Sequence, residues 1–324
     1  MKAIVYDEYG PPDVLEFRDV EVSAPKDNEV LVDVRAASPN PWDWHFMRGE
    51  PYVVRLIHGL RKPGPAAVLG SDMAGQVAAV GTKVTRFRPG DEVFGFVGHG
   101  AFAEQVTAPE AVLAYKPASA TFEQAAAVPL AALTALQGLR DVGEIGSGSQ
   151  VLINGASGGV GTYAVQIAKT LGAEVTAVTS ARNTDLVRSI GADHVIDYTT
   201  QDVLRSGSFD VVMDNVGNHR LSDWRPVIRP DGVFVAVAGL EPMGLWFGVF
   251  AHRLKVRWAS LVGTQRFAGF LAQPTVEDMQ LLHDLLEKGQ IRPVIDRTYS
   301  LSETAAAMAY LEDGHVPGKL VITV

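Results

Sequence analysis

The feature that most constrains this chain is a glycine-rich turn between an apolar strand and an amphipathic helix, within residues 150–172. Residues 151–153 form a short apolar run, and residues 154–159 are almost all small. In residues 160–171, apolar side chains recur three and four positions apart, as on one buried face of a helix. Such a turn lets the backbone approach a pyrophosphate, whose charge is attracted by the unpaired N–H groups of the first helical turn.

The glycine spacing is Gly155-x-x-Gly158-x-x-Gly161 with Gly159 added, which departs from the strict G-x-G-x-x-G pattern. A glycine triplet alone is weak evidence, because a tight turn that binds nothing would look the same. Binding is favoured by the context, since a second strand at 174–179 follows at the distance that a βαβ unit requires. The residues expected to hold the nucleotide are Gly155, Ser157, Gly158, Gly159, Val160 and Gly161.

The length of 324 residues is too great for one ordinary core, so we expect two domains. Residues 1–121 contain short β-branched segments separated by Gly, Pro, Asp and Asn, which is typical of a bent, mostly antiparallel β domain. Two long pieces at 38–52 and 55–69 are expected to be irregular. Residues 122–288 alternate helices and strands, and residues 289–324, β-rich again, are expected to return to the first domain.

Within residues 122–288 the pattern predicts six parallel strands with helices between them, which is a doubly wound α/β sheet. The expected strands are 151–153, 174–179, 194–197, 209–213, 232–237 and 256–261. The expected helices are 160–171, 183–190, about 200–206, 218–228 and 276–288.

Composition excludes several classes of function. Hydrophobic residues make up 47% of the chain and the net charge is −9, with no long basic run, which argues against nucleic acid or an anionic membrane as a partner. The absence of cysteine rules out disulfides, a thiol nucleophile and a thiolate zinc site. The N-terminus has no secretory signal pattern, and the longest apolar tract, 243–251, is too short to span a membrane. We therefore expect a cytoplasmic protein.

Four segments occur in a characteristic order: PLAALTAL, NGASGGVG, DVVMDNVG and HVPGKLVITV. With the N-terminal β domain before them, they resemble the medium-chain dehydrogenase/reductase superfamily along essentially the whole chain. The closest resemblance is to its zinc-independent NADPH:quinone oxidoreductase branch, which includes the zeta-crystallin-like proteins. The resemblance implies a catalytic GroES-like β domain at 1–121 and 289–324, and a Rossmann NADP-binding domain at 122–288.

Zinc-dependent members of that superfamily differ from this chain at their metal ligands. They carry a cysteine near the position of Pro39, and a Gly-His-Glu where this chain has Gly70-Ser71-Asp72. The four-cysteine lobe is also missing, and the eight histidines form no i, i+4 pairs. No metal is therefore expected in the site.

The identity of the nicotinamide cofactor depends on the end of the second strand. NAD-specific sites place an acidic residue there, whereas this chain continues as Ser180-Ala181-Arg182 with no acid before Asp185. Ser180 can donate to a 2′-phosphate, and the guanidinium of Arg182 can pair with it. Alternatively, Ser180 only caps the next helix and Arg182 is an ordinary solvated residue. The position after a glycine turn and one strand favours NADP(H).

The resemblance implies further contacts with the cofactor. Tyr198 matches a position beside the adenosine, and Asn218 matches a polar residue on the ribose side. The remaining matched positions are Val237, Ala238 and Gly239 near the nicotinamide, Thr134 in the alanine-rich helix, and Lys319 as a basic residue near the cofactor. Each of these residues has a structural alternative, such as an N-cap for Asn218.

Hydride transfer to a conjugated carbonyl builds negative charge on the acceptor oxygen, which must be met by hydrogen-bond donors or a proton. In the quinone reductase branch that pocket is lined by the asparagine of an Asn-x-x-Asp stretch and by tyrosines. Asn40 and Asp43 match the stretch, Tyr52 matches one tyrosine, and His45 stands where the other is usual. The expected catalytic residues are therefore Asn40, Tyr52 and His45, although His45 is equally consistent with a structural histidine.

The leading functional hypothesis is an NADPH-dependent oxidoreductase acting on a small planar quinone or enone. One alternative is a cofactor-binding structural or regulatory protein on the same fold. Another is an enoyl-thioester reductase, for which Arg55, Arg61 and Lys62 could form a basic groove toward a carrier phosphate. The resemblance also implies a homodimer, with residues 255–263 as a possible sheet edge.

Overall fold

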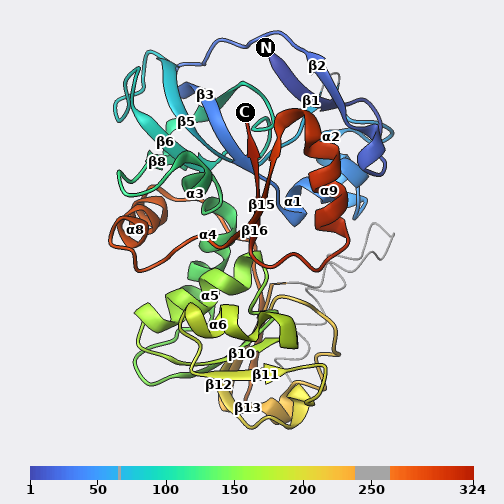
Figure 1. Cartoon of the computed structure of the whole chain (residues 1–324), viewed down its shortest axis with the longest axis vertical. Helices are drawn as coiled ribbons and strands as arrows, with labels where there is room; N and C mark the ends of the chain where they lie inside the picture. The colour runs from blue at the N-terminus through green and yellow to red at the C-terminus, as the bar shows by residue number, and fades with distance from the viewer. Residues whose placement is uncertain (65–66, 238–262) are drawn as a thin grey trace. The chain divides into compact units, whose positions relative to one another are not determined.

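The computed structural model describes residues 1–64, 67–237 and 263–324. The chain divides into two compact units. The first comprises Met1–Leu133 with Gln273–Val324, and the second comprises Thr134–Ala272. In sequence, the second unit is therefore an insertion between two parts of the first. Figure 1 labels many of the elements of each unit by the names used below.

The first unit is built on two sheets whose strands pair mostly antiparallel, as the sequence predicts. The larger sheet has the order β15-β16-β3-β5-β6-β8, and β7 also pairs with β3. Its strands are β3 (Glu29–Ser38), β5 (Asp72–Val80), β6 (Glu92–Phe96), β7 (Gln105–Pro109), β8 (Leu113–Tyr115), β15 (Ile295–Ser300) and β16 (Lys319–Thr323). The smaller sheet has the order β2-β1-β4, from β2 (Glu16–Asp19), β1 (Lys2–Tyr6) and β4 (Ala67–Val68). Because β16 pairs with β3, the C-terminal segment returns to the first unit.

The core of the first unit collects the inward side chains of these strands. Along β3, Val30, Val32 and Val34 are buried and alternate with less buried neighbours, as the strand period of two requires. They join one apolar cluster with Met73 of β5 and Leu113 of β8. Side chains of α1 (Pro41–Arg48) and α9 (Thr304–Glu312) complete this cluster, so α1 is fixed against the sheet core.

The prediction that 38–52 and 55–69 are irregular was wrong, because these pieces contain α1, most of α2 (Val53–His58) and β4. Pro41 occupies the first turn of α1, where a missing N–H costs nothing. Asp43 accepts the N–H of Asn40 at 2.8 Å, which is one half of a capping box. Gly49, at φ 62°, ends the helix in the left-handed conformation. The sequence of this segment therefore encodes a capped helix.

The second unit contains a parallel sheet with the order β11-β10-β9-β12-β13-β14. Its strands are β9 (Gln150–Asn154), β10 (Glu174–Thr179), β11 (His194–Asp197), β12 (Phe209–Asp214), β13 (Ile228–Ala236) and β14 (Arg266–Gly269). Counted along the chain, this is the 3-2-1-4-5-6 order of a dinucleotide-binding sheet, and the order reverses between β9 and β12. The predicted fold class is confirmed. The strand expected at 256–261 lies outside the described residues.

Helices α5 (Gly159–Thr170) and α6 (Thr184–Ser189) connect the first three strands of this sheet and pack against it (Figure 1). The helix expected at about 200–206 is only a 3-10 turn, η5 (Val203–Arg205). The prediction of a helix at 218–228 was wrong, because turns and the 3-10 turn η6 (Arg225–Val227) lead directly into β13. Trp224 is fully buried there and its ring lies 5.8 Å from that of Phe234, so tertiary packing sets this segment.

Helices α3 (Phe122–Ala126) and α8 (Val276–Glu287) belong to the first unit, although the predicted domain boundaries placed both in the second domain. Helix α8 packs on β8, and His283 Nδ1 donates to the carbonyl oxygen of Tyr115 at 2.7 Å. The periodicity of a helix shows which of its faces is buried but not which sheet covers it. The sequence therefore could not assign these two helices.

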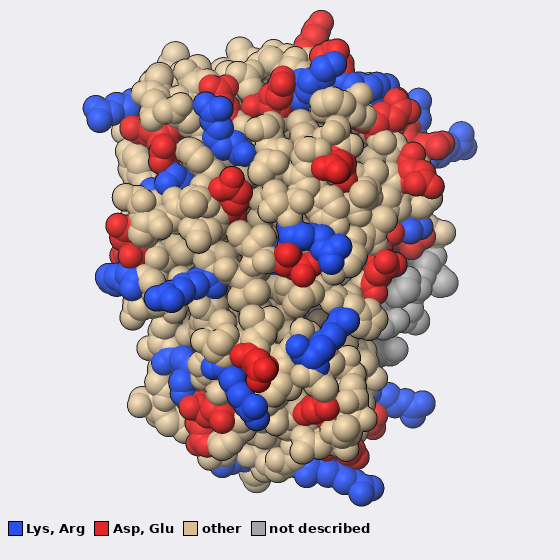
Figure 2. Space-filling view, in the orientation of Figure 1, with Lys and Arg blue, Asp and Glu red and all other residues tan. Residues whose placement is uncertain are grey.

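Among the described residues, no helix combines the length and apolar character needed to cross a bilayer. On the face drawn in Figure 2, Lys and Arg side chains are interspersed with Asp and Glu over the described residues. That face therefore offers no continuous basic track for a nucleic-acid backbone among the residues that the structure describes.

Replacing Gly161 by alanine should destabilise the second unit. A Cβ at Gly161 would lie 2.1 Å from the carbonyl oxygen of Gly155 and 2.7 Å from Cα of Ala156, so the backbone of the turn would have to move. We expect Gly161→Ala to lower the free energy of unfolding by about 1–3 kcal/mol. Urea denaturation followed by fluorescence measures this change.

Gly158 provides the matched control in the same turn. Its backbone is extended, with φ −79°, and a Cβ there would lie 3.5 Å from its nearest described neighbour. Gly158→Ala should therefore change the free energy of unfolding by less than about 1 kcal/mol. Equal losses in the two variants would show that close packing at Gly161 is not the cause.

Candidate functional site

The turn between β9 and α5 has the backbone geometry that a phosphate group requires. Gly155 has a φ of 74°, a left-handed conformation that favours glycine. Gly161 lies so close to Gly155 that a side chain there would collide with the carbonyl oxygen. Gly158 is the N-cap of α5, and no side-chain cap is made there among the described residues. The first N–H groups of α5, around Gly159 and Val160, are therefore placed to meet an anion.

Ser157 ties this turn to the end of the neighbouring strand. Its Oγ accepts hydrogen bonds from Thr179 Oγ1 at 2.8 Å and from Asn183 Nδ2 at 3.0 Å. Thr179 ends β10, and Asn183 follows the segment 180–182. The two predicted parts of the cofactor site, the glycine turn and the segment after β10, are thus joined within one unit. Sequence reasoning missed Thr179 and Asn183, which belong to no motif.

The segment after β10 forms the short 3-10 turn η4 (Ala181–Asn183), with Ser180 as its N-cap residue. The Ser180 hydroxyl makes no capping hydrogen bond among the described residues, so the alternative of a side-chain cap receives no support. Ser180 is half-buried and Arg182 is exposed. Both follow directly on the carboxyl end of a strand, where ligands of doubly wound sheets bind.

Tyr198 lies at the next strand end, just beyond β11. Its side chain is 52% exposed, and its N–H donates to the carbonyl oxygen of Thr179 at 3.1 Å. Asp197 precedes it and accepts hydrogen bonds from the hydroxyl and N–H of Thr199. Those bonds, together with one from the N–H of Ala181, lower the pKa of Asp197. An ionised carboxylate therefore lies next to η4, and its charge is already met by several donors.

Where the strand order reverses, the ends of β9 and β12 bring Asn154 and Asp214 together. Asn154 Nδ2 donates to Asp214 Oδ1 at 2.8 Å and to Asn218 Oδ1 at 3.1 Å. Asn218, predicted on the ribose side of the cofactor, is thereby fixed beside the reversal point. The neighbouring Asn215 has a buried Oδ1 without a partner among the described residues. A buried acceptor at this strand end suits a donor group from a ligand.

The remaining predicted cofactor residues are distributed over both units. Val237 follows β13, and its N–H donates to the carbonyl oxygen of Asp214 at 3.0 Å, which places it at the same sheet edge. Ala238 and Gly239 lie outside the described residues. Thr134 is half-buried in α4 (Pro129–Gln137). Lys319 belongs to the first unit and is buried there.

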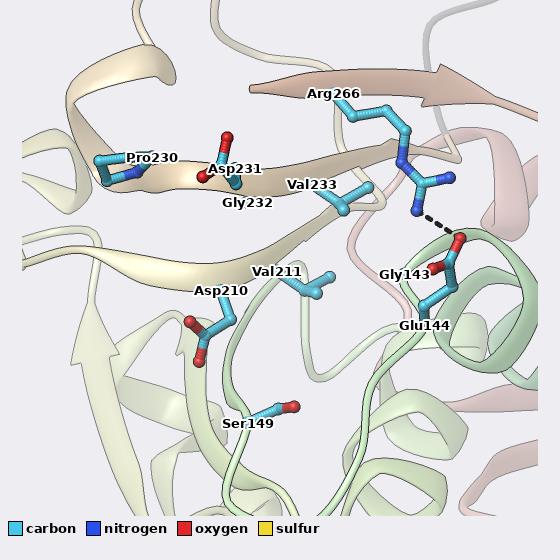
Figure 3. A pocket seen from close by; sticks show the side chains of 10 residues that line it. All are labelled: Gly143, Glu144, Ser149, Asp210, Val211, Pro230, Asp231, Gly232, Val233 and Arg266. Atoms are coloured by element: carbon cyan, nitrogen blue, oxygen red, sulfur yellow. Dashed lines mark ion pairs between the residues drawn. The ribbon is translucent and has the colours of Figure 1, made fainter. Parts of the chain in front are cut away.

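A hollow of about 560 Å³ in the second unit lies at the opposite edge of the sheet (Figure 3). Ser149 stands just before β9, Asp210 near the start of β12, and Arg266 at the start of β14. Arg266 reaches toward Glu144 and pairs with it at 2.9 Å. Because cofactors of such sheets bind at the carboxyl ends of the strands, this hollow at the amino ends is not the nucleotide site.

In the first unit, Asn40 is the centre of a buried polar network. Its Nδ2 donates to Asp72 Oδ2 at 2.9 Å, to Ser71 Oγ at 3.1 Å and to a backbone carbonyl at 3.2 Å. Its Oδ1 accepts a hydrogen bond from Lys319 Nζ, which also donates to a backbone carbonyl at 3.2 Å. Asn40 is 3% exposed. Its amide is therefore engaged by protein groups at both ends.

The network encloses two carboxyl groups and one ammonium. Asp43 Oδ2 accepts from the Asn40 N–H at 2.8 Å and from Ser71 Oγ at 3.0 Å, whereas its Oδ1 is buried without a partner among the described residues. Burial raises the pKa of Asp43 to about 7 and that of Asp72 to about 6. Burial lowers the pKa of Lys319, whose Nζ lies 3.9 Å from Asp72 Oδ2. Burial thus favours the neutral forms of all three groups over their charged forms.

His45 is held by its neighbours on α1 and by the turn that follows. Its ring stacks on Trp44 with centroids 4.0 Å apart, and its Nδ1 donates to the carbonyl oxygen of Glu50 at 2.7 Å. With Nδ1 as the donor, Nε2 of the neutral ring is an acceptor. Burial lowers the pKa of His45, so the ring is neutral at pH 7.

Tyr52 lies directly before α2 and is half-buried. The Arg55 guanidinium lies 4.7 Å from the centroid of the Tyr52 ring and 4.7 Å from that of Tyr9. Arg55 Nε also donates to the carbonyl oxygen of Gly49 at 2.9 Å. Arg55 is thus committed to packing within the first unit, which weakens the basic groove considered for a carrier phosphate.

Trp42 and Phe46, on the same helix as His45, belong to an aromatic cluster. Their ring centroids are 4.9 Å apart, and Phe46 lies 4.4 Å from each of the rings of His58 and His99. The Nε2 atoms of the two histidines are 3.0 Å apart. Sequence reasoning missed this pair, because positions 41 residues apart form no motif.

The family's zinc ligands have no equivalent in the described residues. No group of three or more metal-ligating His, Asp or Glu side chains occurs among them. Pro39 has no side-chain atom that could bind a metal ion. The carboxylate of Asp72 already accepts hydrogen bonds from Asn40 Nδ2 and from the N–H of Leu130, the latter at 3.1 Å. The residues present therefore do not fit the catalytic zinc of the zinc-dependent relatives.

Two family models match parts of the chain. Residues 26–118 match the alcohol dehydrogenase GroES-like domain, and residues 190–322 match a zinc-binding dehydrogenase model. The first match covers strands β3 to β8 of the first unit. The second covers β11 to β14 of the second unit and continues into the C-terminal strands of the first.

Relatives match the chain over nearly its full length. It is 32% identical to a chloroplast envelope quinone oxidoreductase homolog of Arabidopsis thaliana, over 99% of this chain and 98% of that protein. It is 33% identical to a chloroplastic NADPH-dependent alkenal/one oxidoreductase of the same plant, over 99% of this chain and 79% of that protein.

Solved structures agree with these relatives. A quinone oxidoreductase from Coxiella burnetii has a TM-score of 0.88 and 34% identity, covering 100% of this chain and 99% of that one. The Escherichia coli quinone oxidoreductase, solved with NADPH, has a TM-score of 0.83 and 25% identity, covering 100% of both chains. With its GroES-like domain and Rossmann-like domain, the chain belongs to the medium-chain dehydrogenase/reductase superfamily, among the quinone oxidoreductase homologues.

Proposed function

We propose that this protein is an NADPH-dependent oxidoreductase that reduces quinones or α,β-unsaturated carbonyl compounds by direct hydride transfer. The observation that carries the proposal is the glycine turn at the carboxyl end of β9, where Gly161 leaves no room for a side chain beside the reversal of strand order. Relatives named as quinone and alkenal/one oxidoreductases support the acceptor class, and the neighbour solved with NADPH supports the cofactor.

The residues that would hold NADPH come from successive strand ends of the second unit. The N–H groups at Gly159 and Gly161 would meet the pyrophosphate at the start of α5. Ser180 and Arg182 would meet the 2′-phosphate, because no acidic side chain stands between Thr179 and Asp185 in the sequence to repel it. Further along the sheet edge, we propose Asn218 and Val237 for the ribose and nicotinamide side, with Tyr198 beside the adenosine.

When bound, the reduced nicotinamide supplies a hydride to the acceptor. The protein must then meet the negative charge that develops on the acceptor oxygen. Of the predicted residues, Tyr52 is the donor that we favour, because a tyrosine side chain carries an O–H donor. His45 suits this role less well, because its Nδ1–H already donates to Glu50 and its Nε2 is an acceptor.

Asn40 has a different role in this proposal from the one that the resemblance implies. Its Nδ2 hydrogens already serve Asp72, Ser71 and a backbone carbonyl, so none is left to bind an acceptor oxygen. We propose that Asn40 is a positioning residue, which with Lys319 fixes the start of α1 and thereby His45. Lys319 would then act through this network rather than on the cofactor.

The proposal also includes a homodimer and a cytoplasmic location. The segment 255–263, predicted as a dimer edge, lies almost wholly outside the described residues. Relatives named as chloroplast and as mitochondrial proteins show that the compartment varies among them. Light scattering that gives twice the chain mass of 34.7 kDa would support the dimer.

NADPH consumption, followed by its absorbance with a panel of quinones, enones and enoyl thioesters, tests the function directly. We expect turnover with quinones or enones. Consumption with thioesters alone would favour the enoyl-thioester reductase. No consumption with any acceptor, despite tight NADPH binding, would identify a cofactor-binding protein without turnover.

Arg182→Ala should weaken NADPH binding about 10–100-fold, because a charge-assisted hydrogen bond to the 2′-phosphate is worth about 1.5–3 kcal/mol. NADH lacks that phosphate, so its affinity should change little. Calorimetric titration of the purified protein with each nucleotide measures both affinities.

The matched control is Arg188→Ala, an exposed arginine in the last turn of α6. It removes the same charge at a distance from the strand end and should leave NADPH affinity within about twofold, a difference of roughly 0.4 kcal/mol. Equal affinity of the wild type for NADH and NADPH, with no effect of Arg182→Ala, would refute the NADP(H) assignment.

Tyr52→Phe should lower kcat/KM for the acceptor about 10–100-fold, the effect of losing one donor to the developing charge. Tyr9→Phe is its control, because Tyr9 packs on the same guanidinium but its hydroxyl is committed to Gly59. The pH profile separates Tyr52 from His45. A rate that rises as pH falls toward 5, and that His45→Gln abolishes, would identify His45 as the donor instead.

Asp43→Asn should change how stability depends on pH. In the folded chain the pKa of Asp43 is raised above its ordinary value, so the folded state binds the extra proton between about pH 4 and 7. The wild type therefore loses free energy of unfolding as pH rises through this window, whereas the variant cannot titrate there. The free energy of unfolding of Asp43→Asn, relative to that of the wild type, should therefore increase from pH 5 to 8, by at most about 1.4 kcal/mol per pH unit.

Urea denaturation at several pH values measures this difference. Asp13→Asn, which changes an exposed carboxylate, should follow the wild-type curve. If Asp43→Asn is less stable than the wild type by a constant amount at every pH, Asp43 is ionised throughout and the interpretation is wrong.

A further inference from the structure

Two histidines from separate segments of the first unit meet at short range. His58 is the last residue of α2, and His99 lies in the loop after β6. Their Nε2 atoms are 3.0 Å apart, their ring centroids are 4.3 Å apart and their planes are inclined by 70°. Both side chains are half-buried. The two rings therefore meet at an angle, with their Nε2 atoms as the nearest polar groups.

Each imidazole is fixed through an anchored neighbour. The carbonyl oxygen of Gly59, next to His58, accepts the Tyr9 hydroxyl at 2.8 Å. The carbonyl oxygen of Gly98, next to His99, accepts Trp42 Nε1–H at 3.0 Å. The ring of Phe46 lies edge-on to both imidazoles. The pair is thus held by the fold, unlike two flexible surface histidines, and such preorganisation favours binding.

The distance between the nitrogens matches that of a chelate. Two ligand nitrogens at about 2.0–2.1 Å from one ion, at angles of about 90–110°, lie about 2.9–3.4 Å apart. Imidazole nitrogens suit zinc, copper and nickel ions, which bind only neutral rings. Burial lowers the pKa of His58 and lowers that of His99 to about 4, so both rings are neutral at pH 7.

We propose that His58 and His99 form a binding site for one borderline divalent cation, Zn²⁺ or Cu²⁺, which is held by the two Nε2 atoms. Neither histidine is among Pro39, Ser71 and Asp72, the residues that the resemblance places at the positions of the family's catalytic zinc ligands. The described residues supply no third His, Asp or Glu, so water completes the coordination. An ion there joins the end of α2 to the loop after β6.

Calorimetric titration of the full-length, tag-free protein with Zn²⁺ should give one site per chain. His58→Gln and His99→Gln should each weaken binding about tenfold or more, because one imidazole is left as the only protein ligand. The electron paramagnetic resonance spectrum of bound Cu²⁺ should show coupling to two imidazole nitrogens in the wild type. Each variant should lose one of these couplings.

His194→Gln is the matched control in the second unit. His194 Nε2 lies 2.8 Å from Glu174 Oε1, so the control removes an exposed imidazole that is already paired with a carboxylate. The control should keep wild-type Zn²⁺ affinity, and melting curves without metal check that every variant folds. The proposal is overturned if the wild type binds no Zn²⁺, if either pair variant keeps full affinity, or if His194→Gln loses as much. A wild-type copper spectrum without two nitrogen couplings overturns it as well.

Discussion

The first unit depends on the buried side-chain amide of Asn40, which makes hydrogen bonds to several partners at once. Asn40 accepts from the ammonium of Lys319 and donates to the carboxyl of Asp72, so it links two groups of opposite charge that have left water. Removing such groups from water is costly unless hydrogen bonds replace those of the solvent. Each member therefore depends on the others, and together they fix the start of α1, the first residue of β5 and the first residue of β16. Asp72 also accepts the N–H of Leu130, so the start of α4 is held by the same carboxyl.

The second unit was largely predictable from sequence, because its signals are local. The glycine turn, the helix that follows it and the strands at 174–179 and 194–197 arise from periodicity within short windows, and each appears where it was expected. The helix expected at about 200–206 does not, because only a 3-10 turn forms there. The prediction failed at 218–228, where Pro226 and the buried Trp224 override a weak helical pattern. It failed again at 41–48, where a capped helix was interpreted as a loop, because Asn40 and Pro41 are typical of turns when the capping role of Asp43 is overlooked.

The candidate site also has a part that the sequence predicts and a part that it does not. The residues of the nucleotide turn follow from a motif, whereas the connections that organise it, such as Ser157 to Thr179 and Asn183, join positions that are 22 and 26 residues apart. In the first unit the separations are far larger, since Asn40 and Lys319 are 279 positions apart. Each of these residues can be recognised separately in the sequence, but the sequence does not show that their side chains are in contact. That Lys319 lies near the cofactor stays a prediction from the resemblance; within the first unit its Nζ donates to Asn40 and to the carbonyl oxygen of Pro39.

The insertion of the second unit has a consequence for how the protein is made. Residues 134–272 are contiguous, so this unit is complete and able to fold while the ribosome is still adding the last strands. The first unit is not, because its central sheet lacks β16 and its two buried carboxyls lack Lys319 until β16 has been synthesised. Before that point Asp43 and Asp72 have no buried cation beside them. The polar network around Asn40 therefore cannot be complete until the whole second unit has been made.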